Sequence, residues 1–294
     1  MSWFVAAAQA GGRGEPTGVN LKVAAVQFRA STDVEDNARR MADDLNRLAD
    51  QGVQVAAFPE YSLVPYDGKV VTSVPATQVA ALEEQLRKVC RDRKIAAIFG
   101  SVYKVNGHIY NSAVVFDSHG ELIERYGKIH LAGENWCTPG NHISYFELEG
   151  VPSTVMICHD ERYPELARLP AIAGARVLYY ISHESGLDQE TKLVPYRAQL
   201  QARAVENQIF IVNANAPSIV DNVKVCHGQS RIIRDDGNIL QEASIFGQDI
   251  LVETLPIQLG LNRQMVTRPL KDLMNEWWRA GVDDMMKNRH RTLE

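Results

Sequence analysis

Short apolar runs alternate along this chain with segments whose apolar positions recur every three or four residues. The first such unit begins with an apolar run at 22–28 and ends with another at 53–58. Between them, the apolar residues at helical spacing are Val34, Ala38, Met41, Leu45 and Leu48. Thr32 and Glu35 have the spacing of a capping box at the start of this helix. The strand–helix–strand order predicts a sheet covered by helices.

The same alternation continues to about residue 260. Further helices are predicted over 79–89, 164–173 and 190–206. Strands are predicted at 95–103, as a hairpin within 108–126, and at 151–158, 177–182 and 208–213. Residues 228–253 are predicted to form antiparallel strands that turn at Asp236 and Gly237. No internal repeat or linker interrupts the alternation, so we expect one domain at 21–260, preceded by a flexible arm at 1–20.

The remaining segment, 261–294, is predicted to be a helical tail. Its apolar positions at helical spacing are Leu270, Leu273, Met274 and Trp277. Gly281 is predicted to end this helix. An apolar stripe on a terminal helix favours a docking surface over a solvated helix. We expect a partner subunit to receive it, with packing on the chain's own core as the alternative.

The composition is that of a globular protein with a sizeable core, because 45% of the 294 residues are hydrophobic and 23% are charged. Lys and Arg number 31 and Asp and Glu 36, and this net charge of −5 argues against nucleic-acid binding. The four cysteines are too few and too scattered for a disulfide framework, which favours a reducing, cytoplasmic setting. No apolar run approaches the ~20 residues that cross a bilayer, so we expect no membrane association.

Three polar residues stand where predicted strands stop, and ligands collect at such strand ends in sheets covered by helices. Glu60 follows the run at 53–58, Lys128 follows the predicted hairpin, and Cys158 ends the run at 151–158. A carboxylate, an ammonium group and a thiol are the parts needed for acyl transfer through a thioester. A thiol with a pKa near ~8.5 needs a base to attack an amide, and a lysine can stabilise the oxyanion that forms. Taken singly, each residue also has a structural interpretation, as a small buried hydrophobe or a solvated charge.

The residues around these positions resemble the signature segments of the nitrilase superfamily of carbon–nitrogen hydrolases. The matching segments are FPEY at 58–61, YGKIHL at 126–131 and ICHDERYPEL at 157–166. They occur in the family's order, and the likeness, which includes NSA at 111–113, extends over about residues 22–255. Three motifs in order are far more specific than any one of them.

The resemblance implies an α/β fold, a four-layer α-β-β-α sandwich with two mixed sheets, commonly assembled into homodimers or larger homo-oligomers. By position, Glu60 corresponds to the family's general base, Lys128 to its transition-state lysine and Cys158 to its nucleophile. Glu134 stands where many amidases and carbamoylases have a second glutamate, with an exposed loop acid as the alternative. The main-chain N–H of His159 is a candidate second donor to the oxyanion.

Three further residues are candidates for contacts with the substrate. His159 follows the nucleophile where a tyrosine or phenylalanine is commoner, and His183 lies in a stretch, 182–186, that departs from many relatives. We interpret Arg162 first as a structural ion-pair partner and second as a ligand for a substrate carboxylate. His183 is explained equally well as a specificity contact or as a structural histidine.

The sequence therefore predicts a hydrolase of non-peptide C–N bonds in linear amides or N-carbamoyl compounds, with release of ammonia or an amine from a Cys158 thioester. The expected partner is a small-molecule substrate. No cofactor is expected, and no metal, because no Cys and His residues have the spacing of a zinc site. Two alternatives remain: a nitrile-hydrolysing member of the same family, and a catalytically silent binding or scaffold domain.

Overall fold

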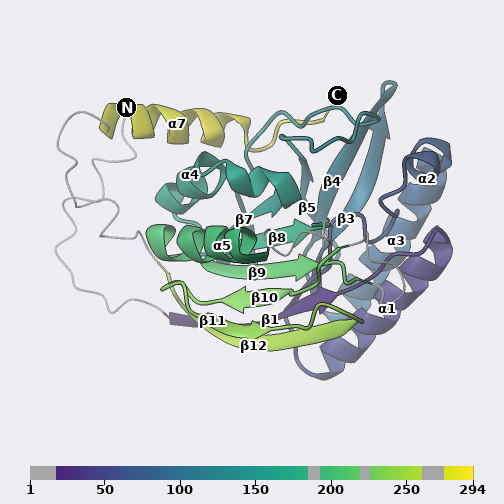
Figure 1. The fold of residues 1–294 in the computed structure, drawn as a ribbon, viewed down its shortest axis with the longest axis horizontal. Helices are drawn as coiled ribbons and strands as arrows, with labels where there is room; N and C mark the ends of the chain where they lie inside the picture. Colours follow the sequence, from purple (N-terminus) through teal and green to yellow (C-terminus); the bar gives the residue numbers. More distant parts are fainter. Residues whose placement is uncertain (1–17, 185–192, 219–225, 260–274, 294) are drawn as a thin grey trace.

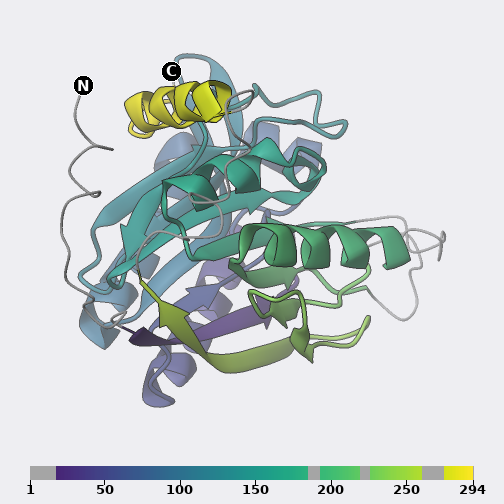
Figure 2. The ribbon, with the colours of Figure 1, turned by 90° about the vertical axis from the view of Figure 1, so that its left-hand side faces the viewer.

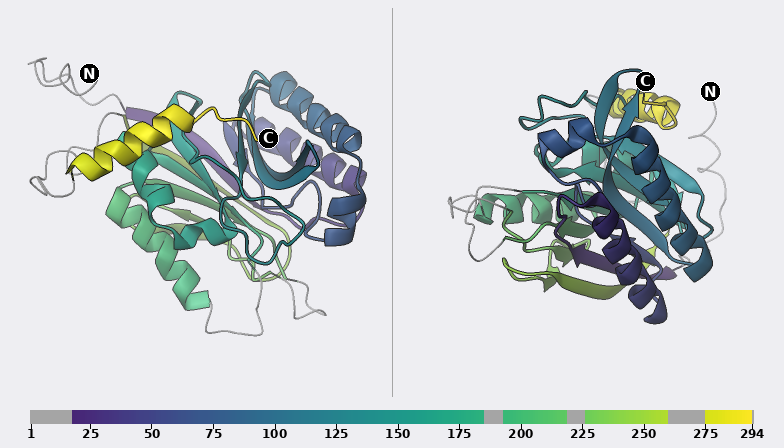
Figure 3. Two further views of the ribbon diagram at one scale, coloured as in Figure 1. Left: turned by 90° about the horizontal axis from the view of Figure 1, so that it is seen from above. Right: turned by 90° about the vertical axis from the view of Figure 1, so that its right-hand side faces the viewer.

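Two six-stranded mixed sheets face each other across the centre of the fold, and helices cover the outer face of each sheet (Figure 1). This computed structural model describes residues 18–184, 193–218, 226–259 and 275–293. Seen from above, the layers follow one another as helices, sheet, sheet and helices (Figure 3, left). The predicted four-layer α-β-β-α sandwich is confirmed.

The first sheet has the strand order β12-β1-β2-β3-β4-β5. Its strands are β1 (Gly18–Gln27), β2 (Val55–Ala57), β3 (Ala96–Val105), β4 (His108–Phe116), β5 (Leu122–Gly127) and β12 (Asp249–Gln258). The pairs β1–β2 and β2–β3 are parallel, and the other pairs are antiparallel. The helices on this side of the fold are α1 (Val34–Asp50), α2 (Gly68–Ser73) and α3 (Ala76–Arg93) (Figure 1).

The second sheet repeats this plan with the strand order β11-β10-β9-β8-β7-β6. Its strands are β6 (Phe146–Leu148), β7 (Val151–Ile157), β8 (Val177–Ser182), β9 (Phe210–Asn215), β10 (Arg231–Ile233) and β11 (Ile239–Glu242). The pairs β7–β8 and β8–β9 are parallel. The helices that cover it are α4 (Glu165–Ala173) and α5 (Leu193–Asn207), and the 3-10 helix η2 (Cys158–Arg162) joins β7 to α4.

Apolar side chains fill three layers between these elements. One cluster lies between the two sheets, a second packs the first sheet on α1 and α3, and a third packs the second sheet on α4 and α5. Every residue of β2 and of β8 is buried. A strand that is buried on both faces has a continuous apolar sequence, which explains why the sequence pattern located these strands.

The helix α1 shows how local sequence and packing agree. The five apolar residues predicted to share its inner face are all at most 6% exposed, and burying each large side chain stabilises the fold by about 1.5–3 kcal/mol. The N-cap is Asp33, whose side chain accepts hydrogen bonds from the N–H groups of Glu35 and Asp36. The predicted cap at Thr32 is therefore wrong by one residue. No helix among the described residues is long and apolar enough to cross a membrane.

The last strands of the chain belong to two different sheets. Residues 228–253 are predicted to form antiparallel strands that turn at Asp236 and Gly237, and this is confirmed for β10 and β11, which pair antiparallel around a turn that contains Gly237. The strand β12 pairs with β1, in the other sheet, with Ala24 opposite Val252 (Figure 2). Alternation in a sequence shows that a strand exists but not which edge it joins. β1 begins at Gly18, within the predicted arm, and residues 1–17 lie outside the described part.

The terminal helix α7 (Asn275–Asn288) continues through Gly281, so the predicted end at that residue is wrong. A Cβ atom at Gly281 would lie 3.0 Å from Leu169 Cδ2, so glycine permits the close packing of α7 on α4 (Figure 3). Met285 and Trp278 pack with Leu169, whereas Trp277 is 60% exposed. This part of the tail packs on the chain's own core, and docking on a partner subunit stays a prediction. Predicted stripe positions 270, 273 and 274 lie outside the described residues.

Candidate active site

The candidate catalytic residues lie at the ends of strands from both sheets. Glu60 follows the parallel strand β2, Cys158 follows the parallel strand β7, and Lys128 follows β5. Because the sheets pack face to face, these ends approach one another although the residues are far apart in sequence. Glu60, Lys128 and Glu134 are each at most 2% exposed, so the alternative of Glu134 as an exposed loop acid is wrong.

A close approach of two strands positions Glu60. The Gly100 N–H donates a hydrogen bond to the Pro59 carbonyl oxygen at 3.0 Å. A Cβ atom at Gly100 would lie 2.6 Å from Glu60 Cα and 2.2 Å from the Tyr61 nitrogen. No side chain fits in that space, so glycine at 100 allows β3 to hold the main chain of Glu60 directly.

Lys128 is held by its main chain on both sides. Its N–H donates to the Asn111 carbonyl oxygen at 2.8 Å, and its own carbonyl oxygen accepts from the Gly140 N–H at 2.8 Å. A Cβ atom at Gly140 would lie 2.0 Å from the Gly127 carbonyl oxygen, so this crossing also requires glycine. These main-chain contacts fix the position from which the Lys128 side chain extends into the site.

Cys158 begins the 3-10 helix η2 with a left-handed backbone, at a φ of +45°. A residue other than glycine in this region stores about 1–3 kcal/mol of strain and persists only where its surroundings hold it. Here the buried Asp160 carboxylate accepts hydrogen bonds from Tyr126 Oη at 2.8 Å and from the Ile157 N–H at 3.3 Å. Strain of this kind is concentrated at functional sites, where a sharp turn presents a side chain.

A buried polar network joins the two acids to the lysine. Lys128 Nζ lies 2.8 Å from Glu60 Oε1 and also contacts Glu134 Oε1. Asn111 Nδ2 donates to Glu60 Oε1 at 2.6 Å and to Glu134 Oε1 at 3.3 Å. The main-chain N–H of His183 donates to Glu60 Oε2 at 2.8 Å. Every carboxylate oxygen of Glu60 therefore has a donor, so the side chain is fixed in one orientation.

Electrostatics keep both members of the Lys128–Glu134 pair charged. Burial alone would lower the pKa of Lys128, but the negative charges of Glu60 and Glu134 outweigh it and raise that pKa above its ordinary value. Burial opposes ionisation of Glu134, yet the Lys128 ammonium lowers the pKa of Glu134 below its ordinary value. The site thus holds a fully charged lysine beside carboxylates near neutral pH.

The thiol of Cys158 is uncharged in the resting site. Burial, and then the negative charge of Glu60, raise its pKa well above the ordinary value, and Lys128 only partly offsets them. A neutral thiol is a weak nucleophile and needs a base at the moment of attack. The arrangement therefore suits general-base activation by a carboxylate rather than a preformed thiolate.

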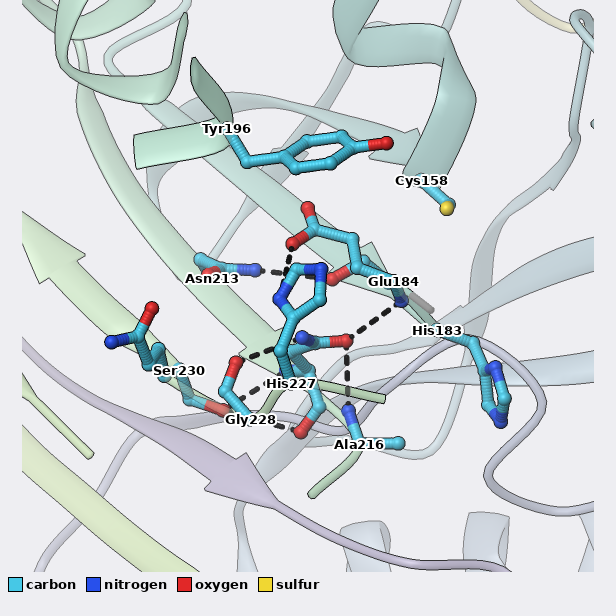
Figure 4. A network of polar contacts seen from close by, with 12 residues as sticks. Cys158, His183, Glu184, Tyr196, Asn213, Ala216, His227, Gly228 and Ser230 are labelled. Carbon is cyan, nitrogen blue, oxygen red and sulfur yellow. Dashed lines mark hydrogen bonds and ion pairs between the residues drawn. The ribbon is translucent and has the colours of Figure 1, made fainter. Parts of the chain in front are cut away.

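A second buried network lies behind the nucleophile (Figure 4). Tyr180 Oη lies 2.9 Å from the Cys158 carbonyl oxygen and 2.8 Å from Glu184 Oε1. Glu184 Oε2 lies 3.4 Å from His227 Nδ1, and the two side chains face each other in the figure. Burial raises the pKa of Glu184. The Tyr180 hydroxyl lies within hydrogen-bond distance of both the Glu184 carboxyl group and the main chain of the nucleophile, and it links the two.

A cavity of about 380 Å³ opens onto Glu60. Its wall includes Tyr66 and His183, whose rings stack with centroids 4.9 Å apart. Arg29 and Asp67 also line it, so it carries charge of both signs. A small concave site with aromatic walls and a few polar groups is typical of small-molecule binding.

Comparison with known proteins places the chain in a family. The family model described as carbon-nitrogen hydrolase matches residues 22–260. The chain belongs to the carbon–nitrogen hydrolase family. A solved structure of a mutant of the Nesterenkonia AN1 amidase, from the nitrilase superfamily, matches this chain with a TM-score of 0.76 at 27% identity. The match covers 90% of this chain and 98% of that chain. The resemblance to the nitrilase superfamily is therefore confirmed.

Curated relatives of this carbon–nitrogen hydrolase include amidases. The human protein named omega-amidase NIT2 is 26% identical over 237 residues, which cover 76% of this chain and 84% of the relative. The 2-oxoglutaramate amidase of Bacillus subtilis is 30% identical over 226 residues, which cover 75% of this chain and 85% of the relative. The names of these two relatives support hydrolysis of amide C–N bonds in general terms.

The predicted substrate contacts are distributed differently in this carbon–nitrogen hydrolase. The ring of His183 lines the cavity, and the half-buried ring of His159 lies edge-on to Tyr163 at 6.0 Å. Arg162 is exposed and donates to the Tyr196 hydroxyl at 3.3 Å. No ion pair of Arg162 occurs among the described residues, and its interpretation as a structural ion-pair partner stays a prediction. Asp160, two residues earlier, bonds to uncharged donors instead.

Three functional candidates were missed in the sequence analysis. Asn111 bridges both glutamates, and its match to the family within 111–113 was the available signal. Glu184 lies in the stretch 182–186 that departs from many relatives, whereas Arg29 carried no sequence signal, and only the fold brings them to the nucleophile and to the cavity. Among the described residues, no group of three or more His, Cys, Asp and Glu side chains has the arrangement of a metal site.

Proposed function

We propose that this carbon–nitrogen hydrolase cleaves linear amides or N-carbamoyl compounds through a thioester on Cys158. The observation that carries the proposal is the buried contact of Lys128 with both Glu60 and Glu134, at strand ends that also carry the thiol. The relatives support amides over nitriles. In one structure of the Nesterenkonia amidase, the acetamide moiety of fluoroacetamide is added covalently at the active-site cysteine.

In the first step, Cys158 Sγ attacks the carbonyl carbon while Glu60 takes the thiol proton. The oxyanion that forms accepts hydrogen bonds from the Lys128 ammonium group and from the main-chain N–H of His159. The C–N bond then breaks, and Glu60 gives its proton to the leaving nitrogen. Ammonia or an amine departs, and the acyl group remains on sulfur as a thioester.

In the second step, water attacks the thioester while Glu60 takes one of its protons. The tetrahedral intermediate collapses, the C–S bond breaks, and the sulfur regains the proton from Glu60. The acid product leaves, so the net reaction consumes one amide and one water. Glu134 positions the Lys128 ammonium through their direct contact, and Asn111 keeps the two carboxylates in place.

The test measures ammonia release from three substrate classes: linear primary amides, N-carbamoyl amino acids and aliphatic nitriles. Cys158→Ala should lower turnover by at least about 1,000-fold, because the nucleophile is lost. Cys137→Ala is the matched control, since it removes another half-buried thiol, which contacts Tyr61 Oη at 3.5 Å, and should retain activity. Glu60→Gln should be as inactive as Cys158→Ala, because an amide cannot relay protons.

Each outcome selects one interpretation. Release from amides or N-carbamoyl compounds that depends on Cys158 supports the proposal and identifies the class. Release from nitriles alone supports the nitrile-hydrolysing alternative. No release from any class, together with a Cys158 thiol that does not react with an alkylating agent, supports a silent binding domain.

A further inference from the structure

A single hydroxyl group connects the nucleophile to a buried acid. Tyr180 Oη lies 2.9 Å from the Cys158 carbonyl oxygen and 2.8 Å from Glu184 Oε1. The hydroxyl carries one hydrogen, and a main-chain carbonyl oxygen can only accept, whereas a carboxyl group donates when it is protonated. Both contacts are therefore full hydrogen bonds when Glu184 is protonated and donates to Tyr180, which in turn donates to Cys158.

The main chain of Glu184 is held in place behind the nucleophile. Its N–H donates to Asn215 Oδ1 at 3.0 Å, and its carbonyl oxygen accepts from the His227 N–H at 3.1 Å. The acid therefore meets the Tyr180 hydroxyl from a fixed position, as a residue that orients another side chain must.

The surroundings of Glu184 favour its protonated form. Glu184 is 4% exposed, and the neighbouring Glu161 is fully buried, with no hydrogen-bond partner for either carboxyl oxygen among the described residues. An ionised carboxylate is costly in such a place, and two acids close together oppose each other's ionisation. Burial raises the pKa of Glu184, and burial together with the charge of Glu184 raises the pKa of Glu161.

Two basic side chains also face Glu184. Arg231 on β10 favours its ionisation, but that guanidinium group is already bound to Glu242 at 2.6 Å. His227 Nδ1 lies 3.4 Å from Glu184 Oε2 (Figure 4), and a charged His227 would favour an ionised Glu184. The other titratable groups that face Glu184 are Glu60, Cys158, Glu161, Tyr180, Tyr196 and Cys226.

The Cys158 carbonyl oxygen belongs to the same peptide group as the His159 N–H. This group is planar and trans, so the N–H points away from the carbonyl oxygen in a fixed direction. A donor on the carbonyl oxygen therefore orients the N–H, and it polarises the peptide group so that the N–H donates more strongly. The left-handed backbone at Cys158 needs such support, because its φ of +45° is strained.

We propose that Glu184, in its protonated form, and Tyr180 position the main-chain N–H of His159 as an oxyanion donor. This inference rests on the proposed thioester mechanism, in which that N–H stabilises the oxyanion. Both are positioning residues, because they act through the peptide group and not on the reacting atoms. Once Glu184 is ionised, the Tyr180 hydroxyl donates to its carboxylate in a charge-assisted hydrogen bond, and the Cys158 carbonyl oxygen loses its donor.

The first experiment removes the hydroxyl. Tyr180→Phe should lower kcat and kcat/KM equally, by about 10- to 100-fold, because the interaction acts on the transition state. Tyr179→Phe is the matched control, since it removes a buried hydroxyl from the same strand at a residue that packs between the two sheets. It should keep the kcat of the wild type, and urea unfolding compares the stability of the two variants.

The second experiment changes the proton. In the wild type, kcat should fall as the pH rises through the raised pKa of Glu184, because the protonated acid is needed. Glu184→Gln keeps an N–H donor to Tyr180 at every pH, so its kcat at pH 7 should stay within about 3-fold of the wild type. The ratio of its kcat to the wild-type kcat should rise about 10-fold or more between pH 7 and pH 10. Glu161→Gln leaves Glu184 in place and should retain the wild-type fall.

A constant ratio from pH 7 to pH 10, or a Tyr180→Phe variant with wild-type kcat, would overturn the inference while the proposed hydrolysis stands. If the wild type hydrolyses no amide or N-carbamoyl compound, the proposed function fails, and infrared spectroscopy still decides the state of Glu184. At pH 7 the wild type should show a protonated-carboxyl band that is absent from Glu184→Gln and shifted in Tyr180→Phe. A band that either variant leaves unchanged would overturn the assignment, and no change in Glu184→Gln would indicate an ionised Glu184 paired with a charged His227.

Discussion

Replacing Lys128 by methionine tests whether the buried ion pairs hold the site together. Glu60 and Glu134 are each 1% exposed, so the substitution leaves two carboxylates buried without their ammonium partner. Removing one partner of a buried pair costs about 3–5 kcal/mol of unfolding free energy. We expect the unfolding free energy of Lys128→Met at pH 8 to be lower than that of the wild type by this amount, as calculated from the midpoint and slope of urea unfolding curves.

The loss should shrink as the pH falls. Without Lys128, burial and mutual repulsion raise the pKa of the Glu60–Glu134 carboxyl pair in the folded variant. In the unfolded chain a glutamate loses its proton above about pH 4.3. The folded variant therefore holds one more proton than the unfolded chain over the range between the two pKa values. Stability then rises with falling pH by up to about 1.4 kcal/mol per pH unit. The recovery is measured as the difference in unfolding free energy between the variant and the wild type at each pH, because other buried acids with raised pKa values, such as Glu184, contribute to both proteins. In the wild type the Glu60–Glu134 pair adds nothing to this recovery, because Lys128 stays charged and holds the pKa of Glu134 below its ordinary value.

Two variants separate this mechanism from a general effect of the substitution. Lys128→Met/Glu134→Gln removes one buried carboxylate and should recover at least about 1 kcal/mol at pH 8. Lys104→Met removes a lysine that donates to the Thr72 and Val74 carbonyl oxygens, and should show no comparable dependence on pH. A Lys128→Met protein that is equally destabilised at pH 5 and pH 8, with no recovery in the double variant, would refute the reasoning.

Two other predictions concern the backbone. Gly100→Ala places a Cβ atom 2.6 Å from Glu60 Cα, so we expect the variant to be destabilised by about 1–3 kcal/mol. If the clash displaces the Glu60 base by about 1 Å, kcat/KM should fall about 100-fold. Full activity of the variant would contradict the close approach. Asp33→Ala removes the observed cap of α1 and should cost about 1 kcal/mol, whereas Thr32→Ala should cost less; the reverse order in urea unfolding would restore the cap predicted from the sequence.

The buried faces of helices and strands were predictable, because burial requires apolar residues at a regular spacing along the sequence. The inner face of α1 and the continuous apolar strands β2 and β8 appear as spacing patterns that need no knowledge of neighbours. The same patterns failed where a choice depended on the partner. Gly281 resembles a helix end, yet its missing side chain makes room for Leu169. The pattern at 249–258 also did not show that this strand pairs with β1 in the first sheet.

The sequence by itself determined the family and proposed Glu60, Lys128, Cys158 and Glu134 as site residues, because short motifs retain residue identity even when their neighbours in space are unknown. Only the tertiary structure decided which groups meet. Asn111 reaches both glutamates, and Arg29 lines the cavity, while the predicted Arg162 contacts Tyr196 at the surface. Hydrogen bonds and ion pairs act over a few ångströms in space, and the spacing of residues along a chain carries no record of those distances.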